Sequence, residues 1–438
     1  SLPKLQTGTV SSHVARDGWC SVSASAPGKV ILHGEHAVVY GALAVAGAIS
    51  QRCRITARWR PADSLDSDSY SRSHAGPIVL NFPALAMRAC LDSAELETAF
   101  SVAKAVAIGK PAEAAGDEPP FSDAELANIG AMAKRVADAQ QFEEQRQREL
   151  CRLALAAFIA VYAWLKPPLL GNVVFLVTGK LPIGGGLGSS AAYAAALAAI
   201  CEALAGREQL DLSRLEAAAF AAETLVHGRP SGVDNACSVR GGFIAYRRPG
   251  PPTPLLPEAD SLLRASGVSL PTVYVADTGQ ARSTASLVAG VRQLADSANL
   301  GASIRRIIDA IDSVSESARR LLVAMATGTA SSTDEADYLA LVRLNQRLLD
   351  CLGVSHPLLD GICQVAEAHG AAAKLTGAGG GGCALIFIPG ACQQQALLDS
   401  LAPACASLQP VQLGEPGVRL EDPQETSAED EELWSKHY

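Results

Sequence analysis

Residues 182–193, which read PIGGGLGSSAAY, combine residue types that suit the binding of an anion. The glycines let the backbone adopt positive φ and approach a ligand closely. Ser189 and Ser190 add hydroxyl groups where a helix is expected to begin. Backbone N–H groups at a helix amino terminus point outward and carry partial positive charge, so this loop can bind phosphate although it contains no lysine. A tight turn between a strand and a helix, capped by the serines, is the structural alternative.

Two well-known nucleotide motifs are excluded by their spacing. The Walker pattern GxxxxGK[ST] does not occur in the chain. Residues 377–382, GAGGGG, satisfy GxGxxG, but a run of glycines does so readily. This run is expected to follow a helix at 355–370 and to precede a strand at 384–388, whereas a dinucleotide-binding turn lies between a strand and a following helix. A Rossmann site is therefore not predicted.

The other titratable side chains of interest do not form a transition-metal site. Glu223 is a single carboxylate in an apolar helical segment, and such a group is costly to bury without a partner. His227 shares its helix face, but no third ligand accompanies the two, so a structural histidine is favoured. His33, Glu35 and His36 lack the HExxH spacing of a zinc protease.

The pattern of apolar residues predicts the elements that position these groups. Residues 172–178 are a β-branched run typical of a buried strand, and the glycine loop follows it. Residues 191–204 are almost entirely apolar helix formers, which predicts a buried helix after the loop. A second helix is expected at 213–227, with Ser213 as its N-cap and Glu216 completing a capping box.

The residues before the glycine loop fall into several compositional segments. Residues 21–48 alternate small and β-branched residues around two glycine turns, which predicts paired strands. Residues 61–75 read as a Ser- and Asp-rich loop. The stretch 84–149 is Ala-rich and charged, and residues 123–165 predict helix with few interruptions.

A proline-rich run at 247–257 marks the expected domain boundary. After it, a strand is predicted at 272–278, then three or four helices, then the second glycine loop leading into a strand, and finally strands within 410–420. Residues 421–432 carry seven carboxylates and few apolar groups. This composition predicts a solvated, disordered end.

Composition limits the class of protein. The 438 residues have a formal net charge of −9, which gives no electrostatic footprint for nucleic acid. No stretch approaches the ~20 consecutive apolar residues of a membrane span, and the amino terminus lacks the pattern of a secretory signal, so a cytoplasmic protein without a membrane partner is expected. The eleven cysteines contain no CxxC pair, which argues against a structural zinc site and a disulfide scaffold.

Three segments together resemble the motifs of the GHMP kinase superfamily. They are APGKVILHGEHAVVYG at 26–41, LPIGGGLGSSAAY at 181–193 and KLTGAGGGGC at 374–383, and they occur in the superfamily's order. Within it, HGEHAVV, ETLVHGRPSGVDNA at 223–236 and STASLVAGVR at 283–292 are similar to the mevalonate kinase family. Galactokinases, of the same superfamily, carry a different first motif with an Asn and a GEHTDY-type continuation, which this sequence lacks.

The second motif departs from the superfamily's usual PPGAGLGSS at two positions. Ile183 and Gly185 stand in place of the second proline and the alanine. These exchanges are expected to make the loop more flexible without removing a hydrogen-bond donor.

The resemblance implies an α+β, two-domain GHMP kinase fold with the active site in the interdomain cleft and a left-handed β-α-β unit around the phosphate loop. The expected domains are a flexible amino terminus at 1–20, an ATP-binding amino-terminal domain at 21–245, a carboxy-terminal domain at 246–420 and an acidic tail at 421–438. The stretch 84–149 has no counterpart in the superfamily's motifs.

The resemblance also implies roles for individual residues. Asp234 matches the proposed base that takes the proton of the acceptor hydroxyl, and Lys29 matches the lysine that pairs with it. Ser190 and Glu223 match ligands of Mg²⁺, a cation that prefers oxygen. The implied contacts to ATP are Lys29, Gly184, Gly185, Gly186, Leu187, Gly188, Ser189, Ser190, Gly379 and Gly380, and the implied contacts to the acceptor substrate are Glu35, His36, Tyr193, Arg282 and Thr284.

Each role has a plainer alternative that the sequence leaves open. Lys29 can be a surface lysine, and Asp234 can stabilise an Asx turn after Gly232. The residues assigned to the acceptor substrate can equally stabilise turns with their polar side chains.

The activity implied by the resemblance is transfer of a phosphoryl group from ATP to the 5-hydroxyl of mevalonate, which yields 5-phosphomevalonate and ADP. A homodimer and feedback inhibition by prenyl diphosphates are further implications of the family. The alternatives are a kinase of the superfamily that acts on another small molecule, and a non-catalytic member that retains the ATP-binding fold.

Overall fold

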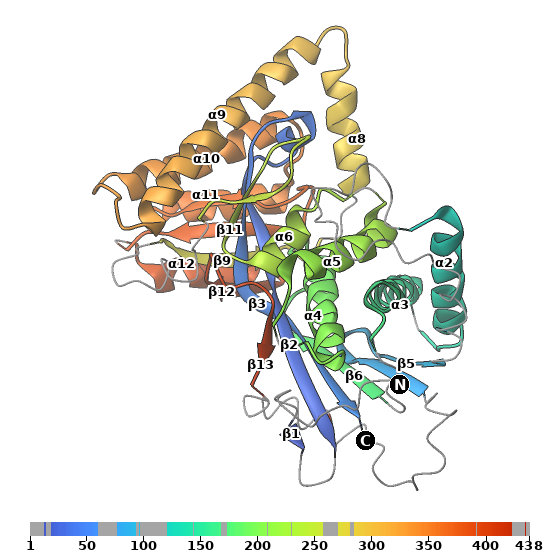
Figure 1. Cartoon of the computed structure of the whole chain (residues 1–438). Coiled ribbons are helices and arrows are strands. Elements are labelled where there is room, and N and C mark those ends of the chain that lie inside the picture. The colour runs from blue at the N-terminus through green and yellow to red at the C-terminus, as the bar shows by residue number, and fades with distance from the viewer. Residues whose placement is uncertain are drawn as a thin grey trace, which may run out of the picture.

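The computed structural model of the chain describes residues 13–14, 19–59, 77–92, 96, 121–142, 144–167, 173–207, 209–228, 230–256, 270–280, 284–390, 392–422 and 434. These residues form two β-sheets with helices packed against each (Figure 1). The Ser- and Asp-rich segment 61–75, the residues between 97 and 120 and the expected contact Arg282 lie outside the described residues. No described helix combines the length and the apolar composition that crossing a membrane requires.

The larger sheet is built around two long antiparallel strands, β2 (Cys20–His33) and β3 (Ala44–Trp59). Their pairing confirms the strands predicted within 21–48. The sheet order is β1-β2-β3-β6-β4-β5, and further strands pair at the side of this path. The other members are β1 (His13–Val14), β4 (Pro77–Phe82), β5 (Met87–Asp92), β6 (Val173–Gly179), β7 (Phe243–Tyr246), β8 (Thr253–Pro254) and β13 (Arg419–Glu421). Short 3₁₀ turns are η1 (Ala37–Tyr40), η2 (Pro83–Leu85) and η4 (Ala402–Ala404).

Helix α4 (Ser189–Leu204) is the central helix packed on this sheet. Every residue from Ala191 to Leu204 is buried, because the helix contacts β2 and β3 as well as three other helices. The predicted buried helix after the glycine loop is thus confirmed. The surrounding helices are α2 (Asp123–Asp138), α3 (Gln145–Leu165), α5 (Leu212–His227) and α6 (Val233–Arg240), and they lie on the same side of the sheet (Figure 1).

The predicted cap of the second helix is wrong. Helix α5 begins at Leu212, and its N-cap is Asp211, whose carboxylate accepts hydrogen bonds from the N–H groups of Ser213 at 3.0 Å and Arg214 at 3.2 Å. The Asp211 side chain thus satisfies two N–H groups of the first turn that have no partner within the helix, and Ser213 lies inside that turn. Glu216 forms an ion pair with Arg240 of α6 at 2.6 Å instead of completing a capping box.

The smaller sheet has the order β10-β11-β9-β12, with all neighbours antiparallel. Four helices separate its first two strands in sequence, as predicted. The second glycine loop was expected to follow a helix directly. Instead, strand β10 lies between α11 and the loop, so the loop connects the antiparallel strands β10 and β11. The elements are β9 (Thr272–Asp277), α8 (Thr284–Ala295), α9 (Gly301–Ala326), α10 (Asp334–Cys351), α11 (Pro357–Ala368), β10 (Ala372–Leu375), β11 (Cys383–Ile388), α12 (Gln394–Leu401) and β12 (Ser407–Val411).

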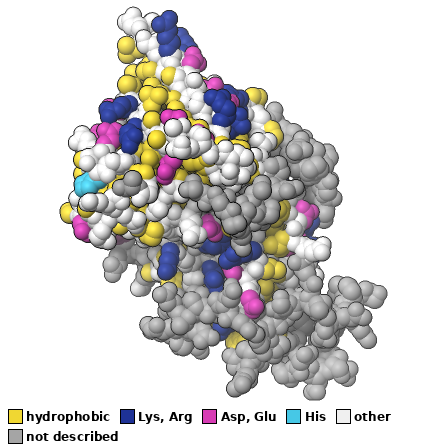
Figure 2. Space-filling model, turned by 90° about the vertical axis from the view of Figure 1, so that its left-hand side faces the viewer, with side chains coloured by type: hydrophobic (Ala, Val, Ile, Leu, Met, Phe, Trp, Pro, Cys, Tyr) yellow, Lys and Arg dark blue, Asp and Glu magenta, His cyan; other side chains and the backbone are white. Residues whose placement is uncertain are grey.

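Charges of both signs lie among the described residues on the side drawn in Figure 2. Lys and Arg side chains lie beside Asp and Glu side chains there.

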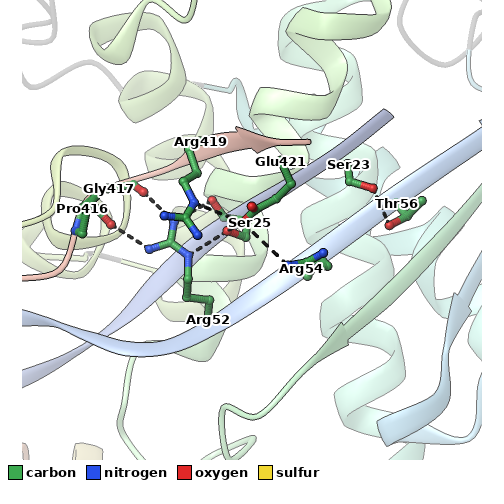
Figure 3. A network of polar contacts seen from close by, with 9 residues as sticks. All are labelled: Ser23, Ser25, Arg52, Arg54, Thr56, Pro416, Gly417, Arg419 and Glu421. Carbon is green, nitrogen blue, oxygen red and sulfur yellow. Dashed lines mark hydrogen bonds and ion pairs between the residues drawn. The ribbon is translucent and has the colours of Figure 1, made fainter. Parts of the chain in front are cut away.

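After the smaller sheet, the chain returns to the larger one, where β13 pairs with β2. Arg52 fixes this return by donating hydrogen bonds to the carbonyls of Pro416 at 2.8 Å and Gly417 at 2.6 Å and to the Ser25 hydroxyl at 2.7 Å (Figure 3). Glu421 was expected to begin a solvated tail, but it is buried and accepts hydrogen bonds from Ser25 and Arg419. The carboxylate is buried because strand pairing brings it beside these donors.

Trp434 is a second residue of the expected tail that is buried. It packs with Val174 and Leu176 of β6, and the guanidinium of Arg58 lies 4.5 Å from the centre of its ring. The expectation of a solvated end at 421–432 is thus wrong at Glu421, while residues 423–433 lie outside the described part of the chain.

We expect Glu421→Gln to lower the free energy of unfolding at pH 7 by about 1.5–3 kcal/mol, because the charge-assisted hydrogen bonds of the carboxylate are lost. Burial acts to raise the pKa of Glu421, but the hydrogen bond from Ser25 and the charges of Arg419 and Arg54 outweigh burial and lower it. The stabilisation is therefore present above the ordinary glutamate pKa and lost as pH falls through the lowered one.

Thermal unfolding of both proteins between pH 7 and pH 3 measures this effect. The difference in Tm between the parent protein and Glu421→Gln should narrow toward pH 3. Asp309→Asn, an exposed carboxylate in the middle of α9, is the control and should leave Tm nearly unchanged. A difference in Tm that is constant over this range would contradict the role given to Glu421.

Candidate active site

A cavity of about 860 Å³ lies where the glycine loops of the two sheets approach each other. Its polar wall comes from β2, the β6–α4 loop and the first turns of α4 and α6, with Glu223 from α5. One face of α8 lies opposite, and Gly377 and Ala378 of the second glycine loop complete the cavity. The apolar wall includes Phe82, Leu85, Leu150, Leu153, Ala154, Ala157, Ile183 and Val226. The cavity thus draws on elements packed against both sheets.

The first glycine loop is held against β2 by a backbone contact. The N–H of Lys29 donates to the carbonyl of Leu187 at 2.8 Å. Gly188 then begins α4 with φ of 71°, and a Cβ at this position would lie 2.9 Å from Cγ of Lys29. Glycine is required here because both the positive φ and the close approach exclude a side chain.

The amino terminus of α4 faces the cavity. Ser189 and Ser190 line it, and no described side chain caps this helix start. The first N–H groups of α4 therefore remain available to an anion, as the sequence predicts. Gly184 and Gly186 line the same cavity with positive φ.

Lys29 and Asp234 form an ion pair across the cavity wall. The Nζ atom of Lys29 lies 3.2 Å from Oδ2 of Asp234, and the two side chains are 8% and 33% exposed. The lysine is nearly buried, so its charge needs a nearby carboxylate, and Asp234 supplies it from the first turn of α6. The positive charge that the glycine loop lacks is thus supplied by β2.

The two residues assigned to Mg²⁺ line the same cavity. Ser190 contributes a hydroxyl from α4, and Glu223 contributes a carboxylate from α5 and is 2% exposed. Within the described part of the chain, no group of three or more His, Cys, Asp and Glu side chains could hold a metal. Two protein oxygens fit a hard cation whose other ligands are phosphate oxygens and water.

Two of the residues assigned to the acceptor substrate also line the cavity. Tyr193 lies on α4, where its hydroxyl donates to the carbonyl of Ala154 at 3.4 Å and its ring lies 5.6 Å from that of Phe82. Burial raises the pKa of the Tyr193 hydroxyl well above its ordinary value, so the group is neutral. Thr284 lies at the first position of α8.

Glu35 and His36 are placed elsewhere, since neither is among the described residues that line the cavity. Glu35 forms a fully buried ion pair with Lys374 of β10 and accepts a hydrogen bond from Asn345 at 3.1 Å. Burial lowers the pKa of Lys374, and the charge of Glu35 opposes this effect. Nε2 of His36 lies 2.8 Å from the carbonyl of Ala378. Both side chains thus tie the end of β2 to the second glycine loop.

Gly379 and Gly380, assigned to ATP, are also not among the described lining residues. A Cβ on Gly379 would lie 2.0 Å from the carbonyl of Val354, and one on Gly380 would lie 2.9 Å from the Leu287 side chain. Close packing therefore explains both glycines without a ligand.

Sequence reasoning missed several residues of the cavity. On α8, Ala285, Val288, Ala289 and Arg292 line it beside the expected Thr284, a spacing that one helix face produces. The resemblance assigned only Thr284 of this helix to the site, and the periodicity by itself does not indicate that the whole face lies opposite the glycine loop. Leu85 gives the otherwise unassigned stretch 84–149 a place in the cavity wall, and Leu150 and Leu153 of α3, directly after that stretch, also line the cavity.

Comparison with known proteins agrees with this geometry. The family model described as GHMP kinases N terminal domain matches residues 152–242, and the model described as GHMP kinases C terminal matches residues 331–404. The chain is 31% identical to mevalonate kinase of Homo sapiens over 418 residues, which cover 90% of this chain and 94% of that protein. It is 34% identical to mevalonate kinase of Bos taurus over 386 residues, which cover 83% and 85%.

The chain belongs to the mevalonate kinase family. Its fold is similar to the crystal structure of L. major mevalonate kinase in complex with R-mevalonate, with a TM-score of 0.61 and 23% identity over 90% of this chain and 95% of that one. The chain is thus a small-molecule kinase with the two GHMP kinase domains. Both family models cover residues of the cavity or of the helices next to it.

We expect Glu35→Gln to lower the free energy of unfolding by about 3–5 kcal/mol, because the charge of Lys374 is then buried without its partner. Combining Glu35→Gln with Lys374→Met should recover most of this loss, since no unpaired charge remains. Urea unfolding of the three proteins measures the effect, and KM for the acceptor is determined in parallel. An unchanged unfolding midpoint with a raised KM would instead make Glu35 a substrate ligand.

Proposed function

We propose that the chain transfers the γ-phosphoryl group of ATP to the 5-hydroxyl of mevalonate, giving 5-phosphomevalonate and ADP. The observation that carries this proposal is the Lys29–Asp234 ion pair. It lies in one cavity with the start of α4, which no described side chain caps, and with Ser190 and Glu223. Phosphoryl transfer asks a protein for positioning and for positive potential around the transferred group, and this cavity offers both. The relatives named mevalonate kinase support the choice of acceptor.

ATP would place its phosphates on the first glycine loop. The free N–H groups of α4 and the ammonium of Lys29 then face the phosphate oxygens. Ser190 and Glu223 would hold Mg²⁺, which neutralises charge on the phosphates when it is bound. The apolar wall around Leu150 and Val226 offers a surface for uncharged parts of a ligand.

Asp234 would receive the proton of the acceptor hydroxyl. Its carboxylate is the more exposed member of the pair, so an acceptor in the cavity can reach it. Lys29 pairs with the carboxylate before transfer and stabilises the alkoxide character of the acceptor during transfer. These two roles explain why Lys29 and Asp234 lie at the wall of the cavity rather than inside the core.

The carboxylate of mevalonate requires a cation in the acceptor end of the cavity. The resemblance assigns Arg282 to this role, next to Thr284 and Tyr193. Arg292 is the one arginine among the described lining residues, and it lies two helical turns beyond Thr284 on the same face of α8. We assign the acceptor end of the cavity to this face of α8. A homodimer, a cytoplasmic location and inhibition by prenyl diphosphates are further proposals that rest on the family.

The proposed activity predicts mevalonate-dependent release of ADP, and Asp234→Asn should lower kcat by about 10²–10⁴-fold because a general base is removed. ATP affinity should change little, since the carboxylate acts at the acceptor. A coupled ADP assay with mevalonate, galactose and phosphomevalonate as acceptors measures activity, and calorimetry measures ATP binding. Asp350→Asn, exposed on α10, is the control. A preference for another acceptor would overturn the substrate, and unchanged kcat in Asp234→Asn would remove it from the mechanism.

Ser190→Ala and Glu223→Gln should each raise the Mg²⁺ concentration needed for half-maximal activity, because each removes one oxygen ligand. A Mg²⁺ titration at saturating ATP and mevalonate measures this shift. Glu335→Gln on α10, which is not among the described residues that line the cavity, should leave the titration unchanged. If neither cavity variant shifts the midpoint, other groups hold the metal.

A further inference from the structure

Asn235 is a fully buried side chain whose hydrogen-bonding groups are both unused. It lies in the first turn of α6 with 0% exposure, and neither Nδ2 nor Oδ1 has a hydrogen-bond partner among the described residues. A carboxamide offers two donors and one acceptor, and leaving them unmet in a buried position costs folding free energy. The residue also lines the cavity next to Asp234. A group so placed calls for a partner that the described part of the chain does not supply.

Other buried asparagines of the described chain differ from Asn235 on both counts. Asn345 donates to Glu35, and Asn81 of β4 has only its Nδ2 without a partner. Neither of them lines the cavity. Asn235 therefore differs from them in having no described partner for either of its polar atoms and in lining the cavity.

The packing of α6 places Asn235 close to the phosphate loop. The hydroxyl of Ser238 donates to the carbonyl of Pro27 on β2 at 2.9 Å. Residues three and four positions apart share a helix face, so Asn235 and Asp234 lie on the side of α6 that faces β2 near Lys29. The backbone of Lys29 in turn holds the phosphate loop at Leu187.

The start of α6 supports an anion at this place. Pro230, Ser231 and Gly232 line the cavity together with Asp234 and Asn235, and Gly232 caps the helix without a side chain. The cavity wall therefore contains the amino termini of two helices, α4 and α6, with the Lys29 ammonium bonded to the first turn of α6. Both helix ends contribute partial positive charge.

We propose that Asn235 is a positioning residue for the transferred phosphoryl group, with Nδ2 donating a hydrogen bond to a γ-phosphoryl oxygen of the bound nucleotide. Asn235 already lines the cavity in which the nucleotide would lie. A hydrogen bond to the phosphoryl oxygen would give Nδ2 of Asn235 the partner that it lacks among the described residues. The proposal rests on the proposed function for the identity of the nucleotide, but not for that of the acceptor.

The test compares binding of a non-hydrolysable ATP analogue and of ADP, both with Mg²⁺, to the parent protein and to Asn235→Ala by calorimetry. Because only the analogue carries a γ-phosphoryl group, its Kd should rise about 10–100-fold while the Kd of ADP changes less than about twofold. No acceptor is needed, so a wrong assignment of mevalonate would not affect this result. With the true acceptor, kcat should fall while KM for the acceptor stays nearly constant.

Two further variants separate binding from folding. Asn235→Leu removes the unmet polar groups at similar volume, so Tm should hold or rise although analogue binding is lost. Asn81→Ala is the matched control at a buried asparagine outside the cavity, and it should affect Tm without changing either Kd. Equal losses for ADP and the analogue in Asn235→Ala, or no loss for either, would overturn the proposal.

Discussion

The near-burial of the Lys29 ammonium is the constraint on which the site depends. A lysine on a central strand needs a carboxylate beside it, and Asp234 meets this need from the first turn of α6. The same residue fixes the glycine loop through its backbone N–H, and its side chain packs where Gly188 has no Cβ. One lysine thus brings together a strand, the start of α4 and the start of α6. The Lys29 ammonium, the N–H groups at the start of α4 and the Asp234 carboxylate therefore meet in one cavity, although they lie in separate parts of the sequence.

Strand β2 extends this arrangement to the rest of the molecule. Beyond Lys29, the N–H and the carbonyl of Ile31 both bond to the hydroxyl of Thr376, and Glu35 pairs with Lys374. These contacts hold the second glycine loop against the end of β2. Before Lys29, the Ser25 hydroxyl and backbone meet Arg52 and the returning strand β13 (Figure 3). Contacts along a single strand therefore position both glycine loops and the last described strand.

Polar groups buried in this protein divide into two kinds. Glu35, Lys374 and Glu421 have protein partners, so their burial contributes to specific pairing of the elements. Asn235 has none among the described residues, and its position in the cavity wall sets it apart as a group reserved for a ligand. Buried polar groups in proteins nearly always have a hydrogen-bond partner, so a buried amide without one among the described residues stands out.

Local sequence determined the secondary structure around the site: the strand before the glycine loop, the buried helix after it, and the positive-φ glycines between them. These features follow from periodicity, helix propensity and the conformational freedom of glycine, all of which act within a few residues. The motifs also indicated Lys29, Ser190, Glu223 and Asp234, which the structure brings to one cavity.

Only the tertiary structure decided which polar residue meets which partner. Glu35 was expected at the substrate, but it forms an ion pair with Lys374. Ser213 was expected to cap α5, but Asp211 is the N-cap. Apart from Thr284, the cavity face of α8 was not predicted, and neither were the apolar wall from α3 and the amide of Asn235, which has no hydrogen-bond partner among the described residues. Sequence patterns report how each element folds and which side it buries, whereas hydrogen bonds and ion pairs between elements form across hundreds of residues and depend on where the packed elements lie in space.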